Sequence, residues 1–236
     1  MGKALDKDIE SLKAMINEMT ITARSMVKDV MEGLVRRDKS MYSKVNDMEE
    51  AANKFEMLTD DLSWKIIALR QPMGADLRFV LAARKINSVL ERTADEAINI
   101  SKKVDYLISV PELKPLIDLP RMTEMAIDAL SSAIETVYNA DMDAARAICI
   151  NDSVIDNLRD QIHRELLTYM QESPDNIQRA INLMMIAKSL ERIGDMATDI
   201  AEDAIYCHQG KDIRHHAESD EEFKKNYKKK EKKEKK

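Results

Sequence analysis

The sequence predicts an all-α fold of two tandem, pseudo-symmetric three-helix bundles, built from six long helices. Glycine and proline together make only 10 of the 236 residues, too few for a chain rich in turns and loops. Apolar residues recur every three or four positions along most of the chain, which is the spacing of one face of a helix, and no stretch alternates like a strand. The second half repeats the plan of the first, so a duplicated unit is the simplest explanation.

The first half is divided by its apolar stripes into three predicted helices, over residues 5–34, 45–69 and 79–107. Residues 36–38, Arg-Arg-Asp, interrupt the first stripe. The second stripe ends at Gln71-Pro72-Met73-Gly74, where proline disfavours helical geometry in the residue before it and glycine permits a turn. These helices form the predicted first bundle, residues 1–110.

Three of the five prolines lie within residues 111–120, which we predict to be a linker to a second bundle of residues 121–216. Breaks at residues 139–141 and 172–175 separate the stripes of this bundle, and Gly210 follows the last stripe as a typical helix stop. The stripes predict helices over residues 122–137, 145–170 and 177–205.

The charge of the chain is unevenly distributed. Residues 224–236 hold nine lysines and two glutamates, a charge of +7. Because the net charge of the whole chain is −6, residues 1–223 carry −13. We predict residues 217–236 to be a charged, disordered tail, because they lack apolar periodicity. The tail suits a solubilising role or attraction to an anionic membrane surface. The acidic body and the lack of a base-reading element beside the lysines argue against nucleic-acid binding.

Several classes of protein are excluded. No apolar run is longer than the five residues of 183–187, whereas a membrane span needs about 20. The N-terminus has no apolar signal segment, and Asp6 stands where a myristoylation signal requires serine or threonine. Cys149 and Cys207 form no metal-type pair and are expected to be free thiols in a reducing cytoplasm. No nucleotide loop, nucleophile elbow or zinc-protease motif occurs, so we do not expect an enzyme.

The duplication is clearest around a Leu-Glu-Arg motif. Residues 90–92 recur as residues 190–192, and the identities continue at the same offset of 100 with Asp95, Ala97 and Ile100. The middle helices also share a short match, residues 45–47 against residues 150–152.

The repeated motif carries a pair of carboxylates four residues apart, Glu91 with Asp95 and Glu191 with Asp195. Residues at this spacing share one helix face about 6 Å apart, so their like charges repel. Asp199 and Asp203 extend the second pair along the predicted ridge, and the middle helix adds Asp152, Asp156 and Asp160. Rows of oxygen ligands suit hard cations.

Two interpretations of these carboxylates stay open at this point: a metal site, or a solvated acidic face neutralised by Arg92 and Arg192. A ferritin-like di-iron site is disfavoured. His163 and His215 each follow an aspartate by three residues, but His215 lies beyond the last predicted helix, whereas such a site needs paired core helices.

The chain resembles the PhoU family of phosphate-uptake regulators over most of residues 5–216. The most specific stretch is residues 69–83, LRQPMGADLRFVLAA, followed by Lys85-Ile86 and residues 90–92. Two further stretches are similar to the other signature of the family. They are residues 190–202, LERIGDMATDIAE, and residues 210–215, GKDIRH.

The resemblance implies a non-enzymatic, cytoplasmic regulator, located in part at the inner face of the membrane. The expected partners are the cytoplasmic subunits of a high-affinity phosphate ABC transporter, which the protein restrains, a phosphate-sensing histidine kinase, and a second copy in a homodimer. The alternative is a metal-storage or metal-dependent hydrolytic helical bundle.

The resemblance also implies metal sites holding iron, magnesium, manganese or zinc. Its Glu-x-x-x-Asp motifs fall on Glu91, Asp95 and Asn99 and on Glu191, Asp195 and Asp199, and we add Asp152 and Asp156 from the middle helix as candidate ligands. Three positions depart from the family pattern: Thr93-Ala94 replaces the usual Ile-Gly, Glu96 follows Asp95, and Met196 replaces a common histidine, so nitrogen ligation there is expected to be lost. The lysine-rich tail has no counterpart in the family.

Overall fold

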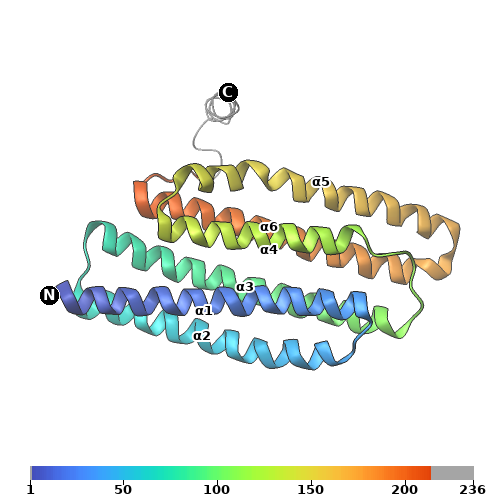
Figure 1. Ribbon diagram of the computed structural model, residues 1–236, viewed down its shortest axis with the longest axis horizontal. Coiled ribbons are helices and arrows are strands. Elements are labelled where there is room, and N and C mark those ends of the chain that lie inside the picture. Colours follow the sequence, from blue (N-terminus) through green and yellow to red (C-terminus); the bar gives the residue numbers. More distant parts are fainter. Residues whose placement is uncertain (1, 214–236) are drawn as a thin grey trace.

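The computed structural model describes residues 2–213 and contains six long helices and one short 3₁₀ turn, with no strand in that range (Figure 1). The predicted disorder of residues 217–236 concerns residues outside the described part. The all-α prediction is confirmed. The elements are α1 (Gly2–Arg36), α2 (Ser40–Arg70), α3 (Gly74–Ser109), α4 (Asp118–Asn139), α5 (Met142–Glu172), η1 (Pro174–Asn176) and α6 (Ile177–Gln209).

Helices α1 to α3 form one bundle and α4 to α6 the other, with α3 and α6 packed along each other between them. In Figure 1 α1 lies in front of α3 and α4 in front of α6, whereas α2 and α5 lie at opposite edges of the molecule. Glu96 of α3 accepts a hydrogen bond from Arg192 of α6 at 3.0 Å, and Lys85 pairs with Asp203. Residue numbers therefore fall along α6 as they rise along α3, so these helices are antiparallel.

Four of the predicted breaks coincide with left-handed backbone, whereas the break at residues 172–175 passes through extended Ser173. Arg37, Gln71 and Ala140 follow α1, α2 and α4 with φ of 55°, 50° and 55°, and Gly210 ends α6 with φ of 68°. Glycine adopts this geometry without steric cost, which is why it stops helices so often. Arg37 also fixes the start of the linker, because its guanidinium donates to the carbonyls of Ile108 and Val110 at 2.9 and 2.5 Å.

The predicted linker is too long by three residues. Helix α4 begins at Asp118, so Pro120 lies in its first turn rather than in the linker. Proline is tolerated there because the first N–H groups of a helix have no intrahelical acceptor. The connection between the bundles therefore covers residues 110–117.

The repeated motif contributes to the core. Leu90 and Leu190 are fully buried, as are Ile100 and Ile200. Gly194 lies where α5 crosses α6, and a Cβ added there would come within 2.9 Å of the Ile155 side chain. The duplicated apolar positions thus form the core inside each bundle. Of the charged positions of the motif, Asp95 and Asp195 are exposed, whereas Glu191 is buried.

The middle helices align at a different offset from the one predicted. Buried Ala52, Thr59 and Ser63 of α2 correspond to buried Ile155, Ile162 and Leu166 of α5, an offset of 103. The offset of 105 from the match of residues 45–47 with 150–152 is therefore wrong. It would place buried Ala52 opposite exposed Asn157, and the burial of apolar side chains decides which face of a helix packs inward.

We expect Leu190→Ala to lower the free energy of unfolding by about 2–5 kcal/mol, because it leaves a cavity in a closely packed core. Leu167→Ala is the matched control, since Leu167 is 49% exposed on α5, and should cost less than about 1 kcal/mol. Urea unfolding monitored by circular dichroism measures both. Equal losses in the two variants would contradict the assigned core.

Candidate functional site

Five carboxylates gather where α5 packs on α6, and we call them the second acidic cluster: Asp152, Asp156, Glu191, Asp195 and Asp199. The pKa of Asp152 is raised to about 6, mainly by burial. The negative charges of its neighbours raise it further: Asp195, Asp156, Glu191 and Asp199. Burial and the charges of Glu191, Asp156 and Asp199 also raise the pKa of Asp195. The structure therefore brings together all five candidate residues that the sequence predicted for this half.

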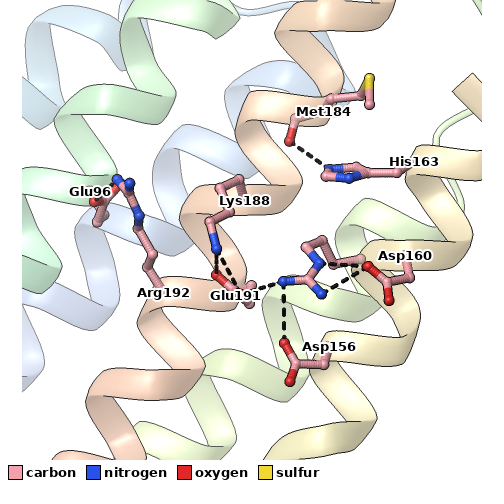
Figure 2. A network of polar contacts seen from close by, with 9 residues as sticks. Glu96, Asp156, Asp160, His163, Met184, Lys188, Glu191 and Arg192 are labelled. Atoms are coloured by element: carbon pink, nitrogen blue, oxygen red, sulfur yellow. Dashed lines mark hydrogen bonds and ion pairs between the residues drawn. The ribbon is translucent and has the colours of Figure 1, made fainter. Parts of the chain in front are cut away.

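Arg159 of α5 lies against this cluster and neutralises part of it. Its guanidinium contacts Glu191 at 2.5 Å, Asp160 at 2.8 Å and Asp156 at 3.4 Å, bonds drawn as dashed lines in Figure 2. Lys188 of α6 contacts the same Glu191 at 2.7 Å. Because Glu191 is only 6% exposed, these two cations supply the pairing that a buried carboxylate requires.

The equivalent seam of the first half holds what we call the first acidic cluster: Glu49, Glu56, Glu91 and Asp95. Burial and the charges of Asp95, Glu56 and Glu49 raise the pKa of Glu91, although Arg92 opposes them. Burial and the charges of Asp60 and Asp95 likewise raise the pKa of Glu56.

Glu49 and Glu56 come from α2 and were not among the predicted site residues. At the offset of 103 Glu49 corresponds to Asp152, so the burial pattern of the middle helices was the signal that could have found it. Asn99 was predicted as a ligand, but its amide lies 3.5 Å from Glu96 and one turn beyond Asp95. The structure gives no contact that joins Asn99 to the first acidic cluster.

Three further expectations are corrected. Asp203 does not continue the carboxylate ridge, because it is buried and paired with Lys85 of α3. Asp160 is held by Arg159 at the edge of the second acidic cluster. Arg192 does not neutralise Glu191, since it donates to Glu96 instead (Figure 2). A regular four-residue spacing hides these differences, because successive residues drift about 40° around the helix.

The departures from the family pattern lie in the α3–α6 interface. Met196 is buried, and its sulfur accepts a hydrogen bond from the Thr93 hydroxyl at 3.3 Å. Glu96 is buried beside it and pairs with Arg192. Met196 thus packs α3 against α6, and the expected loss of nitrogen ligation at this position stays a prediction.

As positioned in residues 2–213, no three histidine, cysteine, aspartate or glutamate side chains are arranged to hold a metal ion. The two clusters nevertheless offer only carboxylate oxygens, the donor set of Mg²⁺, Mn²⁺ and Fe³⁺ rather than of zinc. Both cysteines are free, and burial raises the pKa of Cys149 to about 12. This thiol therefore stays protonated and unreactive at neutral pH.

A groove of about 440 Å³ runs between α2, α3 and α6. Glu56 of the first acidic cluster and Asp199 of the second both line it, and Arg84, Lys85 and Arg92 add positive charge. The two clusters thus border one charged surface that the seam of α3 and α6 crosses. No helix of the described chain is long and apolar enough to cross a bilayer.

Six helices with two equivalent acidic seams define a duplicated helical bundle protein. The sequence model of the PhoU domain matches this chain twice, over residues 16–104 and 119–204. The chain therefore belongs to the PhoU family. Relatives in this family are named as accessory proteins.

Named relatives agree with this assignment. A Zymomonas mobilis protein is 36% identical over 211 residues, covering 89% of each chain, and one from Thermotoga maritima is 30% identical over 210 residues, also covering 89% of each. Both are named homologues of the phosphate-specific transport system accessory protein PhoU.

Solved structures of relatives have the same fold. The crystal structure of PhoU from Pseudomonas aeruginosa superposes with a TM-score of 0.83 at 28% identity, covering 87% of this chain and 99% of that one. A PhoU structure from Streptococcus pneumoniae superposes at 0.80 with 21% identity, covering 89% and 99%, which supports the fold alone.

We expect Asp152→Asn to stabilise the protein at pH 7 in the presence of a chelator. Because the pKa of native Asp152 lies near 6 and the ordinary value is 3.8, its ionisation costs stability as pH rises between these values. Allowing for solvent screening, the gain is about 1–2 kcal/mol at pH 7 and vanishes below about pH 4. Urea unfolding at both pH values measures it, with Asp105→Asn on exposed α3 surface as the control. A gain that persists at the lower pH would contradict this origin.

Proposed function

We propose that this protein is a regulatory accessory subunit of phosphate transport that acts from the cytoplasmic side of the membrane. Its role is to restrain a high-affinity phosphate ABC transporter and to help a phosphate-sensing histidine kinase keep the starvation response off. The observation that carries this proposal is the pair of acidic clusters on a duplicated PhoU fold that matches relatives named as accessory proteins of this transport system.

The two acidic clusters would bind hard cations in this proposal. Carboxylates crowded on adjacent helices repel, as the raised pKa values of Asp152, Asp195 and Glu91 indicate. A bound cation would offset that repulsion and stiffen the helix pairs. Because the side chains do not converge as positioned, binding requires rotation of exposed carboxylates such as Asp95 and Asp195 toward the helix seam.

The charged surface between the clusters is the proposed docking face. Its groove presents five carboxylates and three cationic side chains from α2, α3 and α6. Such a mixture of charges fixes the orientation of a binding partner more than it raises affinity. Trp64 extends this face, because it is 58% exposed and the Cζ atom of Arg84 lies 5.4 Å from the centroid of its ring. Exposed tryptophan and arginine are the side chains that contribute most at protein interfaces. Cytoplasmic domains of the transporter or of the kinase are the proposed partners, and a homodimer is a further proposal.

Deleting the gene should raise phosphate uptake and stored phosphate in cells grown with ample phosphate, because the restraint on transport is removed. The wild-type chain should reverse both effects. Radioactive phosphate uptake and acid-extractable phosphate are the measurements, and a Trp64→Ala/Arg84→Ala chain should complement poorly if the docking face is correctly placed. Unchanged phosphate handling in the deletion strain would contradict the proposal and favour metal storage.

Replacing Glu91 and Glu191 by Gln together with Asp95 and Asp195 by Asn should abolish cation binding without unfolding the bundles. These substitutions keep the shape of each side chain but remove four negative charges, and hard cations need charged oxygen ligands. Metal content after dialysis against Mn²⁺, measured by elemental analysis, tests the loss, and circular dichroism confirms the fold. Full Mn²⁺ retention would overturn the site assignment.

A further inference from the structure

The two acidic clusters are related by the duplication, yet they differ in their internal positive charge. At the offset of 103 Arg159 of α5 corresponds to Glu56 of α2, and at the offset of 100 Lys188 of α6 corresponds to Ser88 of α3. The geometry supports this correspondence, because Arg159 lies 2.5 Å from Glu191 and the charge of Glu56 acts on the equivalent Glu91.

In the second acidic cluster the guanidinium of Arg159 already occupies the space between the helices. It touches Glu191 and Asp156, two of the five carboxylates, and its side chain is only 20% exposed. Lys188 donates to both oxygens of Glu191, at 2.8 and 2.7 Å, so this buried glutamate has two cationic partners. A metal ion could reach this glutamate only by displacing both, and planar guanidinium groups bind carboxylates strongly through several donors.

The first acidic cluster has no such partner. Within residues 2–213 no ion pair joins a lysine or arginine to Glu49, Glu56, Glu91 or Asp95. The nearest cations act elsewhere or at a distance. Arg84 pairs with Asp60 at 3.3 Å, and Arg92 favours the ionised form of Glu91 without a hydrogen bond to it. Within the described residues, the negative charge of this cluster is therefore balanced by no direct ion pair.

We propose that Arg159 is an internal counter-ion that closes the second acidic cluster, so that only the first acidic cluster takes up an external hard cation. This inference rests on the proposed cation binding and makes it asymmetric. The protein would bind cations on one bundle and hold the other bundle together with its own arginine. Arg159 is a positioning residue here, and Glu56 is a ligand in the open cluster.

A charge exchange between the two equivalent positions tests the proposal. Wild-type protein and variants are stripped with a chelator, dialysed against Mn²⁺ and analysed for bound manganese. Glu91→Gln/Asp95→Asn should remove the manganese of the wild type, whereas Glu191→Gln/Asp195→Asn should leave it unchanged. Arg159→Glu should open the second cluster and raise bound manganese roughly twofold, since two equivalent oxygen sites would then be available.

The reciprocal variant, Glu56→Arg, should close the first cluster and abolish binding. Arg164→Glu and Glu50→Arg make the same charge changes at exposed positions of α5 and α2 and should leave manganese content unaltered. The proposal would be overturned if the carboxylate substitutions in either cluster lowered the bound manganese equally. It would also be overturned if the Arg159→Glu variant bound no more manganese than the wild type.

A measurement without metal separates this proposal from the proposed function. In chelated protein Arg159→Gln should lower the melting temperature, because buried Glu191 loses a partner, and a further Glu191→Gln change should restore most of the loss. If the wild type binds no Mn²⁺ but this pair is coupled, cation binding fails and the internal counter-ion stands. Additive effects of the two substitutions would contradict the counter-ion itself.

Discussion

The antiparallel contact between α3 and α6 is the constraint on which the rest of the structure depends. Both helices carry the Leu-Glu-Arg motif, and their fully buried leucines, Leu90 and Leu190, lie in the core. Arg192 and Lys85 fasten the two helices together through Glu96 and Asp203. Each helix thereby turns its remaining carboxylates toward its own middle helix, which is how one packing arrangement produces two acidic seams.

Most of the fold follows from apolar periodicity and from a few turn residues. The six helices and the stop at Gly210 depend on local sequence, because burial of a stripe and left-handed backbone are local requirements. The end of the linker was misjudged, since Pro120 suits the first turn of a helix as well as a loop. The short match of the middle helices misled for a similar reason, because two identities within three residues carry less information than a buried face.

The candidate site was only partly accessible from the sequence. The motif pairs Glu91 with Asp95 and Glu191 with Asp195, and these do lie at the acidic seams. Glu49 and Glu56 were missed because their membership depends on the register between two helices, which side-chain packing sets. Arg159 was missed because it lies within a run of aspartates, and only the fold shows that its guanidinium contacts Glu191 on the next helix.

The duplication also has an evolutionary consequence. Two identical repeats that associate as separate chains must carry identical sites, because symmetry copies every substitution to both. Once the repeats are joined into one chain by residues 110–117, each half mutates on its own. Two equivalent positions can then hold different residues, such as arginine at position 159 and glutamate at position 56. Joining the two repeats in one chain therefore leaves the halves free to specialise.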